Sequence, residues 1–277
     1  MVIKTLVENT STSKEFASEH GLSLYIETGK HKILFDVGAS DLFLQNAKGL
    51  DVQIADIDFL VISHGHYDHG GGLKAFLKEN NTAEIFIHNQ AFKKHYARRT
   101  NDKIDYIGLD ESLKQDKQIV FTSDKFFISK GLQLFSNIVK KEAYPKSNNG
   151  LLIEENEEMV ADTFLHEQNL LIEENGVSLL ITGCAHNGII NILEHFQTVK
   201  GRLPNYVIGG FHLSSRSGGN ETHDTIDRIS EHLIATKAKF YTCHCTGIDA
   251  FERLKSAMGD RIEYLSTGKI IEILPIG

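Results

Sequence analysis

Tryptophan is absent from the 277-residue sequence, and cysteine, proline and methionine occur only three times each. Three cysteines are too few for a disulfide framework, so we expect a protein of the reducing cytoplasm. No apolar run approaches the roughly 20 residues that a membrane helix needs, and residues 1–8 resemble a strand rather than a signal peptide, so we expect no membrane partner. The formal net charge of −8 also argues against non-specific binding to nucleic acid.

The sequence does hold enough apolar residues to bury a large core. Hydrophobic residues make up 41% and charged residues 24%, as in ordinary globular proteins. No linker or internal repeat divides the chain, so we expect a single α/β domain over residues 1–277. The sequence leaves open whether the chain forms a homo-oligomer. It also contains fourteen histidines, an unusually large number, which favours a metal protein.

The densest group of histidines lies between 63 and 73, in the sequence SHGHYDHGGGL. His64, His66, Asp68 and His69 follow an apolar run at 57–62 that predicts a buried strand, and a helical pattern follows them. Imidazole suits zinc, iron and related ions, and the neighbouring carboxylate suits a harder ion. We therefore predict a metal site at this turn between a strand and a helix.

The pattern His64-x-His66-x-Asp68-His69 resembles the metal signature of the metallo-β-lactamase superfamily. The resemblance implies an αββα sandwich that holds two divalent ions, with zinc the first choice and Mn²⁺ or Fe²⁺ as alternatives. It places His64 and His66 at the first metal position and Asp68 and His69 at the second. It also implies that Asp36 braces the metal loop from behind through hydrogen bonds.

Three expected strand ends in the second half carry His186, His212 and His244. Their motifs, TGCAH, GGFHL and HCTG, resemble a branch of the superfamily that includes the 7,8-dihydropterin-6-yl-methyl-4-(β-D-ribofuranosyl)aminobenzene 5′-phosphate synthase. We predict His186 and His244 as metal ligands. His212 and Cys184 are further candidates, for metal or substrate.

Cys184 stands where most of the superfamily has a bridging Asp. Its thiolate can bind zinc, or the side chain is buried packing and His186 alone reaches a metal. His166 and Glu167 are alternatives to His186 at the first position. For Cys243 and Cys245, which flank His244, packing is favoured over ligation.

Hydrophobic periodicity and turn signals predict the remaining elements. Strands are expected at 2–8, 21–27, 31–36, 84–88, 118–122, 125–129, 132–135, 166–173, 177–182, 205–208, 239–243 and 270–274. Helices are expected at 42–50, 70–78, 189–199, 221–236 and 248–258.

Residues 89–165 are harder to assign, and we interpret them as a lid or insert that sets substrate choice. The basic, aromatic segment 91–99 is expected to form a short helix, on which Lys94 and Arg98 would share a face. Lys93, Lys94, Arg98 and Arg99 are candidate partners for a substrate phosphate, and the alternative is a solvated basic face.

These patterns favour a metal-dependent hydrolase or transferase that acts on a phosphorylated or pyrophosphorylated small molecule, pterin-like or nucleotide-like. Asp68 is the candidate proton acceptor in catalysis. One alternative is a di-iron relative of oxidoreductase type, and another is a non-catalytic pterin- or nucleotide-binding metalloprotein. A ribonuclease of the same superfamily is disfavoured by the negative charge.

Overall fold

The computed structural model describes residues 1–215 and 219–274, and two mixed seven-stranded sheets dominate it. The first sheet has the strand order β20-β1-β2-β3-β4-β5-β8, in which β3, β4, β5 and β8 run parallel. Its strands are β1 (Val2–Val7), β2 (Ser23–Glu27), β3 (Lys32–Phe35), β4 (Phe59–Ile62), β5 (Glu84–His88), β8 (Ile119–Thr122) and β20 (Ile270–Glu272).

The second sheet has the order β19-β18-β15-β14-β13-β10-β9, with β14, β15, β18 and β19 parallel. Its strands are β9 (Lys125–Ser129), β10 (Leu132–Phe135), β13 (Asn169–Glu174), β14 (Val177–Ile181), β15 (Tyr206–Gly209), β18 (Lys239–Thr242) and β19 (Ile262–Tyr264). Both sheets therefore have one antiparallel half and one parallel half, and the carboxyl ends of the parallel strands carry the loops of interest below.

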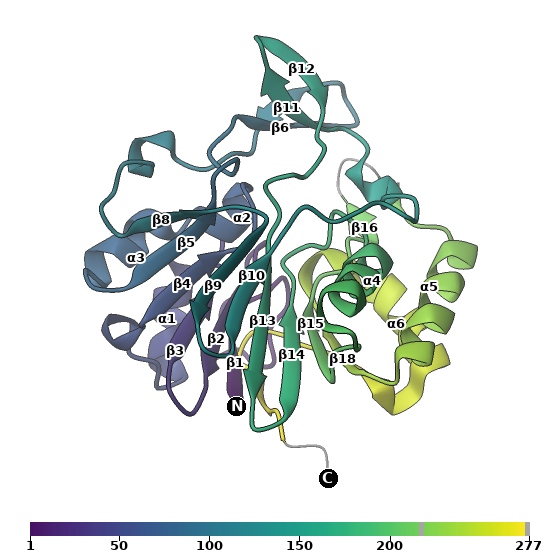
Figure 1. Ribbon diagram of the computed structural model, residues 1–277. Coiled ribbons are helices and arrows are strands. Elements are labelled where there is room, and N and C mark those ends of the chain that lie inside the picture. The colour runs from purple at the N-terminus through teal and green to yellow at the C-terminus, as the bar shows by residue number, and fades with distance from the viewer. Residues whose placement is uncertain (216–218, 275–277) are drawn as a thin grey trace.

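Helices cover the outer face of each sheet (Figure 1). The helices α1 (Leu42–Gly49), α2 (Tyr67–Gly70) and α3 (Leu73–Glu79) lie on the side of the first sheet, and α4 (Ile189–Lys200), α5 (His223–Thr236) and α6 (Ile248–Met258) on that of the second. Short 3-10 turns are η1 (Ile54–Asp56), η2 (Glu111–Leu113), η3 (Lys146–Asn148), η4 (His244–Thr246) and η5 (Gly259–Arg261). No helix among the described residues is long and apolar enough to cross a lipid bilayer.

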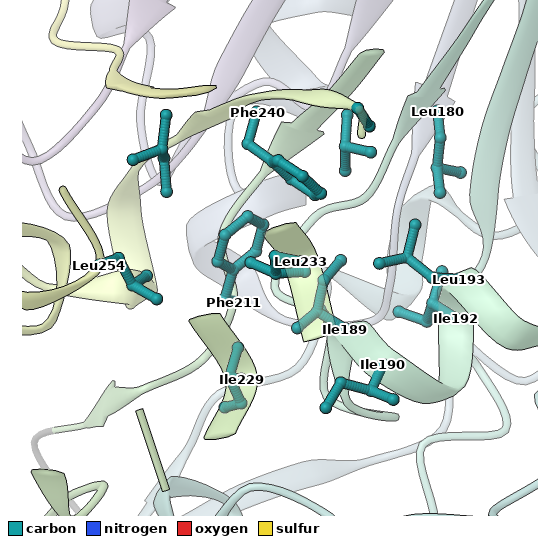
Figure 2. Packing of buried hydrophobic residues seen from close by; sticks show 14 of the residues in the cluster. Leu180, Ile189, Ile190, Ile192, Leu193, Phe211, Ile229, Leu233, Phe240 and Leu254 are labelled. Atoms are coloured by element: carbon teal, nitrogen blue, oxygen red, sulfur yellow. The ribbon is translucent and has the colours of Figure 1, made fainter. Parts of the chain in front are cut away.

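Three layers of buried side chains hold the sandwich together. One layer lies between the sheets, where Phe35 and Val61 of the first share a cluster with Leu170 and Ile181 of the second. A second packs α1 and α3 on the first sheet. A third packs α4, α5 and α6 on the second sheet, and Figure 2 shows Leu193, Leu233 and Leu254 of these helices around it. This confirms the predicted αββα sandwich.

The region 89–165 is divided between the sandwich and a separate four-stranded sheet, here called the lid sheet. The strands β8, β9 and β10 belong to the two main sheets, so the insert is smaller than expected. The lid sheet has the order β12-β11-β6-β7 and consists of β6 (His95–Arg98), β7 (Ile104–Tyr106), β11 (Leu151–Glu155) and β12 (Glu158–Ala161). It rises above one end of the sandwich (Figure 1).

The helix expected at 91–99 is wrong, because residues 95–98 form β6. His95 and Ala97 are buried while Arg98 is exposed, and the strand pairs with β11 and β7 on its two sides. Lys94 and Arg98 are four residues apart, a spacing that suits one face of a helix and equally one face of a strand. A small two-stranded sheet of β16 (Ser214–Ser215) and β17 (Gly219–Asn220) completes the described elements.

Candidate metal centre

The predicted ligands meet at the end of the sandwich that lies below the lid sheet. His64 and His66 follow β4, and Asp68 and His69 lie in α2 directly after them. His186 follows β14, and His244 begins η4 after β18. All of these strands belong to the parallel halves of their sheets, where the carboxyl ends of the strands gather ligands in open α/β folds.

The first group consists of His64, His66 and His186, which could hold one metal ion. His64 Nε2 lies 3.1 Å from His66 Nδ1 and 3.3 Å from His186 Nε2. Two ligand atoms about 2.1 Å from a tetrahedrally coordinated ion are about 3.4 Å apart, so the nitrogens are already spaced for a shared metal. All three side chains are buried. His166, the alternative to His186, is instead hydrogen-bonded to Gly65 and Asp162.

The second group is built around Asp68, His69 and His244. His69 Nε2 lies 3.2 Å from His244 Nε2, and Asp68 Oδ2 lies 3.4 Å from the same His244 atom. His20 Nε2 also lies 3.3 Å from Asp68 Oδ2, and no motif in the sequence pointed to His20. A carboxylate and two imidazoles suit zinc and the harder divalent ions.

Cys184 lies between the two groups. Its Sγ is 3.1 Å from His69 Nε2, and it shares candidate metal clusters with His64 and His69 and with His186 and His212. Cys245 also lies near it, in a cluster with Cys184 and His244. Cys243, by contrast, is buried in the core between the sheets. The thiol of Cys184 is therefore placed where a ligand shared by both groups would be.

Partners on the outer side of the rings orient most of these histidines. Asp36 Oδ2 lies 2.7 Å from His69 Nδ1, and the same carboxylate accepts hydrogen bonds from the backbone and hydroxyl of Ser63. Ser63 Oγ lies 2.8 Å from His64 Nδ1. Asn148 Oδ1 lies 2.8 Å from His186 Nδ1, and Asn9 Oδ1 lies 2.8 Å from His244 Nδ1. Such partners fix which ring nitrogen is bare and can bind a metal.

Sequence reasoning identified Asp36 but missed Asn9 and Asn148. Asn9 lies in a loop and Asn148 ends the short 3-10 turn η3, and each is far along the chain from the histidine it contacts. A lone Asn in a polar segment carries no signal. Glu167, considered above as a ligand, is also an outer partner, because its Oε1 accepts the backbone N–H of His186 at 2.6 Å.

Burial and neighbouring charges set the charge states of the site. Burial lowers the pKa of His64, His66 and His186 well below the usual value, so these rings are neutral at neutral pH and have a lone pair for a metal. Burial alone would raise the pKa of Asp68, but His69, His20 and His244 outweigh it and hold that pKa well below its usual range. Asp68 is therefore ionised.

The backbone of the site is strained at several of these residues. Asp36 has a φ of 60°, His212 of 49° and His244 of 51°, all in the left-handed region that residues other than glycine rarely adopt. Such conformations cost about 1–3 kcal/mol each and gather at functional sites. His212 is also buried, and no hydrogen bond to either of its ring nitrogens is found among the residues that the structure describes.

A cavity of about 350 Å³ opens above the two groups. Its lining includes His20, His66, Asp68, His186, His212 and His244 on one side and Ala97, Arg99, Asp105, Ile107 and Leu151, from the lid sheet and its adjoining loops, on the other. Of the four basic candidates for phosphate binding, Arg99 lines this cavity, and its Nε donates to Asp105 Oδ2 at 2.9 Å. Lys93 and Lys94 pair with Glu155 and Glu154.

Comparison with known proteins decides the family. Residues 19–133 match the family model described as the metallo-beta-lactamase superfamily. A protein of Methanocaldococcus jannaschii named 7,8-dihydropterin-6-methyl-4-(beta-D-ribofuranosyl)-aminobenzene-5′-phosphate synthase is 32% identical over 98% of this chain and 96% of its own length. The chain belongs to the metallo-β-lactamase superfamily.

Two further proteins resemble the chain over nearly its whole length. An uncharacterized protein of Methanocaldococcus jannaschii, MJ0448, is 32% identical over 98% of this chain and all of its own. The crystal structure of Tm1679, described as a metal-dependent hydrolase of the beta-lactamase superfamily, has a TM-score of 0.84. It is 29% identical and covers 99% of both chains.

The donor sets of this superfamily member fit metal ions. The ring nitrogens that face the first group are bare and neutral, and the distances between donors match a shared ion. Within residues 1–215 and 219–274, no hydrogen bond is found to His66 Nε2 or to either nitrogen of His212, and all three atoms are buried. Members of the superfamily typically bind metal ions. The resemblance assigned His64 and His66 to one metal position and Asp68 and His69 to the other, and these two pairs lie in adjoining groups of donors.

Proposed function

We propose that the protein is a metal-dependent hydrolase or transferase that holds two divalent ions and acts on a phosphorylated or pyrophosphorylated small molecule. His64, His66 and His186 hold the first ion, and Asp68, His69 and His244 hold the second, with Cys184 beside both. The observation that carries the proposal is that members of both donor groups, His66 and His186 of the first and Asp68 and His244 of the second, line one cavity that Arg99 also lines. The relative named as a pterin-related synthase and the neighbour named as a hydrolase support it.

When bound, divalent ions at these positions supply Lewis acidity, which activates water as a nucleophile and neutralises negative charge on a phosphate or pyrophosphate. The first choice is Zn²⁺, because five imidazoles and a thiol dominate the donor set, and Mn²⁺ or Fe²⁺ are the alternatives.

The chain's own residues bind and orient the substrate. Arg99 presents a guanidinium to phosphate oxygens across the cavity from the histidines, and its contact with Asp105 fixes its direction. Ala97, Ile107 and Leu151 offer an apolar surface on the same wall, which suits the face of a pterin or a nucleobase. His212 also lines the cavity, and its imidazole can hydrogen-bond to the polar edge of such a ring.

Asp68 is the group we assign to proton transfer. Its carboxylate lines the cavity and is ionised because His69, His20 and His244 lower its pKa against the effect of burial. An ionised carboxylate can accept a proton from the attacking water or hydroxyl group, and His20 and His244 hold it in position at 3.3 and 3.4 Å.

The test combines metal content with a substrate screen. The purified protein is assayed for release of phosphate or pyrophosphate from phosphodiesters, cyclic nucleotides and pterin pyrophosphates, with and without an aminobenzene nucleophile to separate transfer from hydrolysis. We expect His66→Ala to remove most activity and at least one metal equivalent, because it deletes a ligand of the first group. The control is His232→Ala in α5, outside the site. Unchanged metal stoichiometry in His66→Ala would contradict the assignment.

A further inference from the structure

His66 is the one predicted ligand among the five histidines whose outer ring nitrogen lacks a partner in the described residues. His64, His69, His186 and His244 are each oriented by Ser63, Asp36, Asn148 or Asn9. His66 turns Nδ1 toward His64, so its Nε2 points away from the first donor group, and this Nε2 is buried without a hydrogen bond. With a metal on Nδ1, the proton of the ring resides on Nε2 and requires an acceptor.

A buried cluster behind His66 offers such an acceptor. Asp162 Oδ2 lies 3.0 Å from His95 Nδ1 and 3.1 Å from His166 Nε2, and Asp162 Oδ1 accepts the backbone N–H of Phe164. Both histidines therefore carry their proton on the nitrogen that faces Asp162, and their other nitrogens are bare. The bare Nδ1 of His166 accepts the backbone N–H of Gly65 at 2.9 Å. The Nε2 of His95 is buried, and no hydrogen bond to it is found among the described residues.

The two unpartnered atoms are complementary, and they belong to neighbouring rings. His66 Nε2 carries a proton to donate and His95 Nε2 has a lone pair to accept it. The ring centroids lie 5.6 Å apart at 79°, and His66, His95, Asp162 and His166 contribute nitrogen or oxygen atoms within 4.8 Å of one another. Gly65 permits this approach, because a Cβ there would lie 2.6 Å from His95 Nε2.

We propose that His95 and Asp162 are positioning residues for the first metal position, and this rests on the proposed function. His95 Nε2 accepts the His66 Nε2–H, directly or through one water, and Asp162 fixes the tautomer of His95 that makes this possible. His95 belongs to β6 and Asp162 directly follows β12, so both come from the lid sheet or its end. The lid sheet thus forms the cavity wall and also orients a ligand of the metal it covers.

The test compares His95→Phe, which keeps a ring without an acceptor, with His95→Gln, whose amide oxygen replaces Nε2. The control is His88→Phe, since His88 is also a buried histidine but lies outside this cluster. Zinc affinity is measured by competition with a chelator, and the slowly exchanging His66 Nε2–H is followed by NMR in the zinc-loaded protein. We expect His95→Phe to weaken binding of one zinc equivalent about 10–100-fold and to lose the N–H signal. His95→Gln should restore both, and His88→Phe should change neither.

Several results would overturn the inference. One is that His95→Phe keeps the zinc affinity of the parent and the His66 Nε2–H signal. A lower melting temperature of the metal-free His95→Phe protein would then show only that His95 stabilises the fold. Another is a third zinc equivalent that His95→Phe removes, since the cluster would then be a metal site itself. If His95→Phe does not fold, the same two measurements are made on Asp162→Asn. This variant removes the carboxylate that keeps the proton of His95 on Nδ1. Failure of the parent to bind Zn²⁺, Mn²⁺ or Fe²⁺ would instead refute the proposed function itself.

Discussion

Cys184 is the residue at which the site departs from the pattern of its superfamily. Most members have a bridging Asp there, and here a thiol lies 3.1 Å from His69 Nε2. Burial and the neighbouring Cys245 raise the pKa of this thiol well above its usual value. A buried neutral thiol is inert, whereas a metal ion would favour the thiolate. Cys184 can therefore act as a ligand only when a bound ion favours its thiolate form.

We predict that Cys184→Ala weakens metal binding, whereas Cys243→Ala does not. Both cysteines are buried at or just beyond strand ends of the second sheet, but Cys243 lies in the core between the sheets. Cys243→Ala should lower the free energy of unfolding by about 1 kcal/mol, typical of a point substitution. In the Co²⁺-loaded protein, the near-ultraviolet absorption of a thiolate–cobalt bond should disappear only in Cys184→Ala. If the band survives there, Cys245 is the ligand and our reading of Cys184 as the bridging thiol fails.

At the scale of elements, the sequence predicted the strands and helices that carry the ligands and failed in the lid sheet. The turn at 63–69 could be predicted because all four of its functional side chains are adjacent in sequence. The strand β6 could not, because Lys94, which directly precedes it, and Arg98, which ends it, have a spacing that suits a helix and a strand equally. Asp162 contacts His95, and Asn148 contacts His186, only in the folded chain, because each pair is far apart in sequence. No local sequence pattern indicates such contacts.

The lid sheet leads to a prediction about phosphate recognition. Arg99 follows β6 and lines the cavity, whereas Lys94 pairs with Glu154 at 2.8 Å on the surface. We expect Arg99→Ala to weaken binding of a phosphorylated pterin or nucleotide by about 1.5–3 kcal/mol, or roughly 10–150-fold, for the lost charge-assisted contact. Lys94→Ala serves as the control and should have little effect, because exposed ion pairs contribute little.

The measurement is the affinity of each variant for the phosphorylated ligand and for the same ligand without its phosphate. Arg99→Ala should reduce the preference for the phosphorylated form. An equal loss for both forms would show that Arg99 shapes the cavity without binding the phosphate.

At the scale of the whole molecule, the candidate metal centre draws its residues from both halves of the sandwich. His64, His66, Asp68 and His69 come from the first sheet and its helix, and His186 and His244 come from the second sheet. The hydrophobic layer between the sheets already holds them together. An ion held by donors from both sheets would connect the loops at the end of the sandwich. Metal binding and folding should therefore be linked.

We therefore predict that removing the metal lowers the stability of the entire fold. A ligand that binds only the folded state stabilises it by about 4 kcal/mol when its free concentration is 1,000 times its dissociation constant. For a chain of this size, that corresponds to a fall of roughly 8–16 °C in the unfolding midpoint after chelation. The measurement is calorimetry of the loaded protein, the chelated protein and the chelated protein after Zn²⁺ is restored. His66→Ala should show a smaller change on chelation, because it lacks a ligand of one ion. An unchanged midpoint in protein shown to be metal-free would mean that the hydrophobic layer alone holds the two sheets together.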